Sequence, residues 1–157
     1  MAKRVFLETT IPSFLASWHS RDLLQAARQQ ITFSWWEDHR HAYDLCTSQI
    51  VLDEVAAGDP DAAQKLLAVL KDIPLLDLTN EVGDLATAIM ESGLLPPKAV
   101  RDALHIAVSA VHGVDFLLTW NCRHIANATI MKELESVVRN QGFELPILCT
   151  PEQMLGE

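Results

Sequence analysis

The chain has 157 residues, of which 49% are apolar and 21% charged, and its formal net charge is −9 at pH 7. This length and composition are typical of one globular domain with its own core, so we expect a single domain over residues 1–157. An acidic chain without a basic tract is poorly suited to broad electrostatic binding of nucleic acid, because lysine and arginine supply that attraction.

Membrane insertion and disulfide bonding are not expected from this sequence. No apolar run reaches the roughly 20 residues that a membrane-spanning helix needs. Only Val5-Phe6-Leu7 follows the basic start before Glu8, which is too short for a signal peptide. The three cysteines are widely spaced and form no Cys-x-x-Cys pair. We therefore expect a cytoplasmic protein without a membrane segment.

Hydrophobic periodicity and capping residues predict alternating strands and helices. Thr10, Ser48 and Thr79 are expected to cap helices, and Gly113 and Gly142 to end them. In chain order the pattern predicts a strand over 3–7, helices over 11–15 and 21–41, a strand over 44–47, helices over 49–57 and 61–71, a strand over 74–78, helices over 80–90 and 98–112, a strand over 114–119, a helix over 127–141, and a strand over 146–150.

This alternation predicts an α/β fold, with a central, mostly parallel sheet of four to five strands and helices on both faces. Ligands of such sheets bind outside the carboxyl ends of the strands. Glu8 lies just past the first strand and Asn121 just past the fourth. Glu54 and Asp102 lie in the first turns of two helices. We expect these four residues to converge at one edge of the sheet.

At this point the sequence resembles the PIN-domain family of metal-dependent ribonucleases, which includes the VapC-type toxins of type II toxin–antitoxin modules. Four segments in the family's order carry the resemblance, and with the elements between them they cover nearly the whole chain. They are Val5-Phe6-Leu7-Glu8-Thr9-Thr10, residues 47–55 (TSQIVLDEV), residues 101–107 (RDALHIA) and residues 115–121 (DFLLTWN).

The resemblance implies that Glu8, Glu54, Asp102 and Asn121 form an acidic catalytic site that holds Mg²⁺ or Mn²⁺. Two positions depart from the family pattern. Glu8 stands where the family has an aspartate, so its carboxylate reaches one methylene further. Asn121 stands where the family has a fourth acid, so the site loses one charge. Both residues still offer oxygen ligands that these metals accept, and one ion could bind tightly while a second arrives with the substrate phosphate.

The resemblance further implies an endoribonuclease, with RNA as substrate, an antitoxin protein as partner and a homodimer as the assembly. Activated water would cleave the phosphodiester bond without a nucleophilic side chain. Cations beside the site could grip phosphates locally, despite the acidic total. The residues expected to support or bind substrate are Thr9, Thr10, Arg101, His105, Arg123 and His124.

Other interpretations of these residues remain open. Glu54 and Asp102 could be ordinary acids that the helix dipole favours, and His105 could equally be a core residue. The chain could also be a catalytically weakened PIN-fold interaction module, which the replacements at Glu8 and Asn121 favour. A phosphatase is a weaker alternative, because the first strand lacks an Asp-x-Asp arrangement. Of the adjacent Trp35 and Trp36, a helix can bury only one in the same core.

Overall fold

A computed structural model describes residues 2–156 of the chain. Its centre is a five-stranded, entirely parallel sheet, which confirms the predicted α/β fold with a mostly parallel sheet of four to five strands. The sheet order is β3-β2-β1-β4-β5. The strands are β1 (Lys3–Leu7), β2 (Tyr43–Ser48), β3 (Leu75–Leu76), β4 (Phe116–Leu118) and β5 (Ile147–Cys149).

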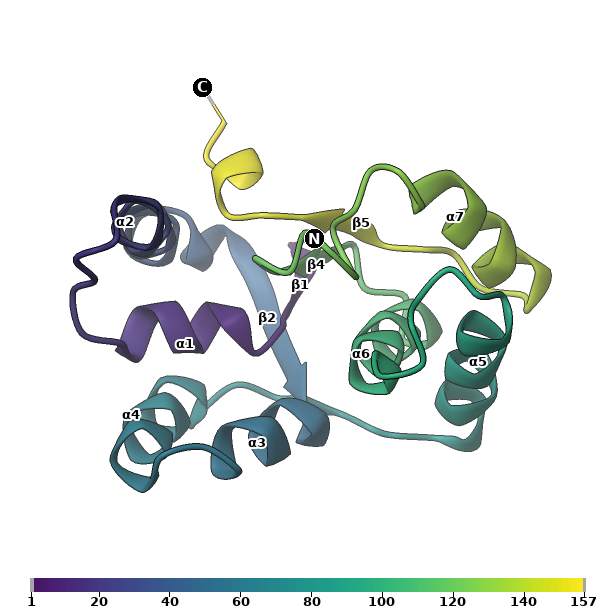
Figure 1. Ribbon diagram of the computed structural model, residues 1–157, viewed down its shortest axis with the longest axis horizontal. Helices are drawn as coiled ribbons and strands as arrows, with labels where there is room; N and C mark the ends of the chain where they lie inside the picture. The colour runs from purple at the N-terminus through teal and green to yellow at the C-terminus, as the bar shows by residue number, and fades with distance from the viewer. Residues whose placement is uncertain (1, 157) are drawn as a thin grey trace.

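Helices cover both faces of this sheet (Figure 1). In that view α1, α2 and α4 lie to the left of the strands, whereas α5, α6 and α7 lie to the right. No helix of residues 2–156 is both long and apolar enough to cross a membrane. The helices are α1 (Thr10–Ala16), α2 (Leu23–Asp38), α3 (Gln49–Ala56), α4 (Pro60–Leu70), α5 (Asn80–Glu91), α6 (Val100–Val111) and α7 (Met131–Asn140), with short 3₁₀ turns η1 (Arg40–Ala42) and η2 (Glu152–Met154).

The strand order places a switch point beside β1. The chain first moves outward from β1 to β2 and β3, and then returns to β4 on the other side of β1. Crossovers that leave a strand in opposite directions open a crevice at its carboxyl end, where α/β proteins bind ligands. Leu7 pairs with Leu118, so β1 and β4 end side by side. Glu8 and Asn121 follow these two strand ends.

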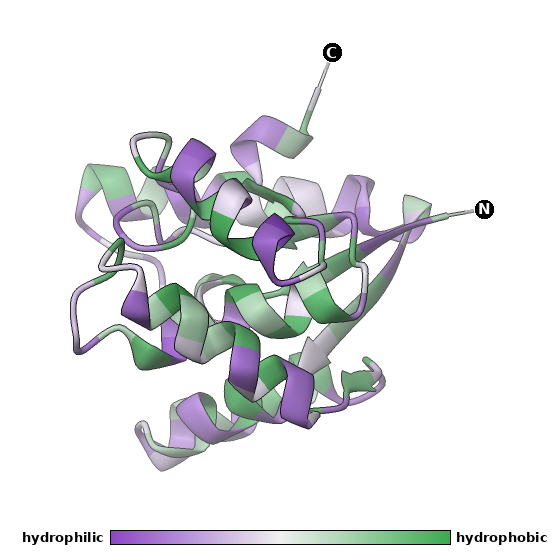
Figure 2. Cartoon of the chain, turned by 90° about the vertical axis from the view of Figure 1, so that its right-hand side faces the viewer, coloured by the Kyte–Doolittle hydropathy of each residue, from purple (hydrophilic) through white to green (hydrophobic). Residues whose placement is uncertain are grey.

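Burial explains why β1 occupies the centre. Val5, Phe6 and Leu7 have no exposed surface, as expected for a strand covered on both faces. Full burial of one such side chain contributes roughly 1.5–3 kcal/mol. Helix α6 buries most of its length from Ala103 to Ala110. The outer helices instead carry both apolar and polar residues (Figure 2), so each directs one face inward.

Several predicted element boundaries were wrong. The helix predicted over 127–141 begins only at Met131, because the Asn127 side chain accepts hydrogen bonds from the backbone and hydroxyl of Thr129. Such local bonds favour a turn over a helix. The strand predicted over 74–78 pairs only at Leu75–Leu76. Helix α1 starts at Thr10, whose hydroxyl serves the site described below instead of capping the helix.

Candidate functional site

Glu8 lies just past β1 with its side chain turned into the protein, only 4% exposed. Its Oε1 atom accepts three hydrogen bonds: from the Thr10 amide at 3.1 Å, the Thr10 hydroxyl at 2.6 Å and the Thr119 hydroxyl at 2.7 Å. Three donors on one oxygen fix the direction of this carboxylate. Glu8 therefore ties the carboxyl end of β1 to that of β4.

The same two threonine hydroxyls also hold the turn after β4. The Thr10 hydroxyl accepts a hydrogen bond from the Trp120 amide at 2.8 Å. The Thr119 hydroxyl accepts one from the Asn121 amide at 2.9 Å. Each hydroxyl thus donates its one proton to Glu8 and accepts one hydrogen bond from the backbone. The position of Asn121 is therefore coupled to the position of Glu8.

Glu54 enters the site from α3 and is held by two residues. The Thr9 hydroxyl donates to its Oε1 atom at 2.8 Å, and the His105 Nε2 atom lies 2.5 Å from the same oxygen. Burial acts to raise the pKa of the Glu54 carboxyl. The hydrogen bond and the charge of His105, the hydrogen bond of Thr9 and the charge of Arg101 together outweigh burial and lower this pKa from its ordinary value. Glu54 is therefore ionised at neutral pH.

Asp102 lies in the first turn of α6 and is paired with the loop that follows β4. Its Oδ1 atom accepts a hydrogen bond from the Asn121 side-chain amide at 3.1 Å, and its Oδ2 atom lies 2.9 Å from His124 Nδ1. The Asn121 side-chain oxygen in turn accepts from the His124 amide at 2.9 Å. Asn121 therefore presents its NH₂ group to Asp102, where the fourth acid of the pattern would present a negative oxygen.

A cavity of about 570 Å³ opens between α3 and the start of α6. Glu54 and Asp102 both line it, as do the exposed residues Lys98 and Arg101. Two carboxylates and two cations thus border one space. The cavity is therefore suited to a ligand that carries negative charge together with a cation.

Hydrogen bonds, together with the adjacent chain positions of Glu8 and Thr9, link the four predicted acidic-site residues through the ends of β1 and β4. Thr9 joins Glu54 to the segment of Glu8, and Thr119 joins that segment to Asn121. The predicted supporting hydroxyls of Thr9 and Thr10 contact carboxylates. His105 has no exposed surface and contacts Glu54.

The other two expected substrate contacts lie in the turn after Asn121, and sequence reasoning missed one residue of the site. Arg123 is exposed in the turn after Asn121, and His124 is bonded to Asp102. Sequence reasoning did not assign a role to Thr119, although a buried threonine at the end of β4 beside Asn121 was the available signal. Asp115, by contrast, binds the Arg4 amide near the start of β1, away from this site.

Magnesium is commonly bound by one or two carboxylates together with water and substrate phosphates, so the pair Glu54 and Asp102 suits a hard divalent cation. Within residues 2–156, no group of three or more histidine, cysteine, aspartate or glutamate side chains is gathered closely enough to hold an ion. The carboxylates instead belong to three hydrogen-bonded groups, centred on Glu8, Glu54 and Asp102. Glu54 and Asp102 are the pair that shares a cavity.

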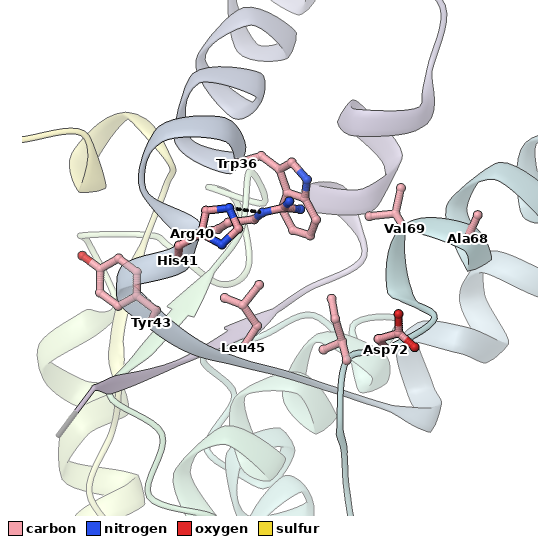
Figure 3. Close-up of a pocket in the computed structure, with 9 residues that line it drawn as sticks. Trp36, Arg40, His41, Tyr43, Leu45, Ala68, Val69 and Asp72 are labelled. Atoms are coloured by element: carbon pink, nitrogen blue, oxygen red, sulfur yellow. Dashed lines mark hydrogen bonds between the residues drawn. The ribbon is translucent and has the colours of Figure 1, made fainter.

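A second cavity, of about 350 Å³, is lined by residues of α2, η1, β2 and α4 and of the loop after α4 (Figure 3). Tyr43 lines it from the start of β2, and the Arg40 guanidinium lies 4.4 Å from the centre of the Trp36 ring. Trp35 is fully buried beside it, which confirms that one of the two tryptophans belongs to the core. Polar residues here include Asp72 on the far wall, and no carboxylate cluster is present among its lining residues.

Comparisons with known proteins bear on the fold. No protein-family model and no curated protein matches the sequence. A chain of the crystal structure of VapBC2 from Rickettsia felis, bound to a DNA fragment from their promoter, superposes with a TM-score of 0.61. The two chains are 18% identical, and the match covers 94% of this chain and 98% of that one. Together with the all-parallel sheet and its two helical layers, this match shows that the chain has a PIN-like α/β fold.

Proposed function

We propose that the protein is a metal-dependent endoribonuclease that hydrolyses RNA phosphodiester bonds, and that it is the toxin-like component of a type II toxin–antitoxin module. The observation that carries this proposal is the cavity shared by Glu54, Asp102, Lys98 and Arg101. The same cavity thus offers carboxylates that could bind a cation and basic side chains that could bind a phosphate. The PIN-like fold and its VapBC2 structural neighbour support the choice of nucleic acid as substrate.

Glu54 and Asp102 are the residues that would hold Mg²⁺ or Mn²⁺, with Glu8 and Asn121 completing the set directly or through water. When bound, such a cation supplies an activated water and stabilises negative charge on the phosphate oxygens. Glu54 is ready for this role because its lowered pKa keeps it ionised. Asn121 and His124 hold Asp102 by both of its oxygens, which fixes the direction of its carboxylate.

Local cations would bind the substrate in this acidic protein. Lys98 and Arg101 line the cavity, and Arg123 is an exposed residue next in the chain to His124, which contacts Asp102. Contacts from these side chains to phosphates would position RNA without reading its sequence. Because the net charge is −9, the attraction is confined to this region, and substrate binding should weaken with added salt.

The test is cleavage of RNA in the presence of Mg²⁺ or Mn²⁺ by the wild type and by Asp102→Asn. The substitution keeps the size of the side chain but removes its charge, so we expect a large loss of cleavage. Asp84→Asn, an exposed position on α5, is the matched control and should cleave like the wild type. Equal cleavage by the wild type and Asp102→Asn would sink the proposal.

A protein antitoxin is the proposed partner, and we assign to it the surface formed by the segment after α1 and the first turn of α2. Trp18, Leu23 and Leu24 are 84%, 88% and 59% exposed, which is unusual for large apolar side chains. Co-expression with the product of a neighbouring short reading frame, followed by purification, tests this pairing. Trp18→Ser with Leu23→Ser should weaken the complex while the free protein stays folded. The toxin assignment also implies a cytoplasmic homodimer.

A second candidate function is a PIN-fold interaction module with little catalysis. The observation that favours it is the saturation of Glu8 Oε1 by three donors, together with the amide that Asn121 presents to Asp102. Manganese binding separates the two functions. Binding that is lost in the double variant Glu54→Ala, Asp102→Ala supports the enzyme, whereas a lack of binding at millimolar metal supports the module.

A further inference from the structure

His105 stands out as a fully buried polar side chain that contacts Glu54, one of the residues lining the cavity. It lies on α6, one turn after Asp102, and has no exposed surface. One face of its ring packs near Phe6 of β1, with the ring centres 6.0 Å apart. Its Nε2 atom lies 2.5 Å from Glu54 Oε1, and its Nδ1 atom is buried without a hydrogen-bond partner.

The contact between His105 and Glu54 identifies the donor. An ionised carboxylate only accepts hydrogen bonds, so a 2.5 Å contact with Glu54 Oε1 requires an N–H group at Nε2. A ring proton therefore lies on Nε2, between the ring and the ionised Glu54. His105 is accordingly a hydrogen-bond donor to Glu54, and its only polar contact through the side chain within residues 2–156 is to that carboxylate.

This bond determines which oxygen of Glu54 is free. Thr9 and His105 both contact Oε1, and within the described chain no protein donor reaches Oε2. A glutamate side chain has three rotatable bonds, so a carboxylate at 22% exposure would otherwise sample several directions. With Oε1 held from two sides, Oε2 is the oxygen that remains free for a ligand of the cavity that Glu54 lines.

We propose that His105 is a positioning residue, which fixes the Glu54 carboxylate for cation binding and does not itself touch RNA. The proposal rests on the proposed metal-dependent function and adds a role to a residue that sequence reasoning expected at the substrate. Packing alone does not explain a histidine here. A leucine would fill the space between α6 and β1 without burying an unpaired nitrogen.

The experiment compares His105→Gln with His105→Leu. The glutamine side-chain amide can place an N–H near the position of Nε2, whereas leucine removes the donor and keeps the bulk. Ser109→Ala is the matched control, because Ser109 is buried on the same helix and its hydroxyl only donates to the His105 carbonyl. RNA cleavage, manganese affinity and thermal unfolding are measured for all four proteins, including the wild type.

Loss of an outer hydrogen-bond partner of a metal ligand typically costs about 10–100-fold in metal affinity or activity. We expect His105→Leu to lose about that much in manganese affinity and kcat, with KM little changed and the fold intact. His105→Gln should retain most of both, and Ser109→Ala should behave as the wild type. Wild-type affinity and kcat in His105→Leu overturn the proposal, as does an equal loss in His105→Gln.

The experiment distinguishes failure of the ribonuclease proposal from failure of the positioning role of His105. If the wild type binds manganese but cleaves no RNA, the ribonuclease proposal fails, and the manganese affinities of the two variants still decide the role of His105. If the wild type does not bind manganese, both proposals fail. Nitrogen-15 spectra of the metal-free protein add an independent criterion: a proton on Nδ1 of His105 instead of Nε2 overturns the positioning role whatever the activity.

Discussion

The carboxylate of Glu8 and the hydroxyl of Thr119 are joined by a 2.7 Å hydrogen bond, although they lie 111 residues apart in the chain. Both side chains are buried, and each sits directly after the last paired residue of its strand. The extra methylene that distinguishes glutamate from aspartate lets the carboxylate reach this partner. Glu8 is thus a structural link as well as a proposed site residue.

Thr119→Val should destabilise the protein by about 1–3 kcal/mol, because it leaves Glu8 and the Asn121 amide without their shared partner in a buried setting. Thr119→Ser keeps the hydroxyl and is expected to lose less. Urea unfolding measures both values, provided that the slope of the unfolding free energy against urea concentration is the same for all the proteins. A valine variant as stable as the wild type would contradict the linking role of Glu8.

Asn121→Asp should make the stability of the protein depend on metal. The new carboxylate replaces an N–H donor with a negative oxygen beside Asp102, so without metal we expect a loss on the order of 1 kcal/mol. For a chain of this size that loss corresponds to roughly 2–4 °C in the melting temperature. Manganese should recover it by binding the folded state. An equal deficit in EDTA and in manganese argues against a cation at this position.

The pH dependence of stability should report on Glu54. Its pKa is lowered in the folded state, so its ionised form contributes stability that is fully present above the ordinary value of 4.5. This contribution is lost as the pH falls through the lowered value. In EDTA, the stability difference between the wild type and Glu54→Gln should therefore be constant near neutral pH and shrink in acid. If this stability difference grew as the pH fell, the pKa of Glu54 would be raised in the folded state, contrary to the prediction.

The three thiols should react at different stages. Burial raises the pKa of Cys46 to about 11 and that of Cys149 to about 12, whereas Cys122 is exposed. Because the thiolate is the reactive form, a disulfide reagent at pH 8 should modify Cys122 in the native protein. Cys46 and Cys149 should react only after denaturation. Release of three equivalents under native conditions would show that the core opens readily.

The parallel sheet was predictable because its signals are local. The run Val5-Phe6-Leu7 is apolar without alternation, which indicates a strand buried on both faces. Helix α6 repeats small and apolar residues at helical spacing. The ends of elements were less predictable, because side chains such as Asn127 and Thr10 make hydrogen bonds that depend on tertiary contacts or on competition with the helix.

The residues that form the site were predictable from the ends of the strands, but the hydrogen bonds between them were not. Glu8 and Asn121 follow neighbouring strands, and that placement follows from the alternation of elements alone. The partner of each carboxylate depends on rotamers that only packing decides. His105 illustrates this, since its spacing from Asp102 indicates a nearby face of α6, whereas its contact with Glu54 arises from another helix.

The strand order also has a consequence for the timing of folding. The first strand made, β1, sits between β2 and β4, and its pairing with β4 joins residues more than a hundred positions apart. Contacts of such long range form late and slow the folding reaction. During synthesis, Glu8 therefore has no Thr119 to bind until most of the chain has left the ribosome. A nascent chain cannot assemble the proposed ribonuclease site beside its own messenger RNA before residue 121 has emerged.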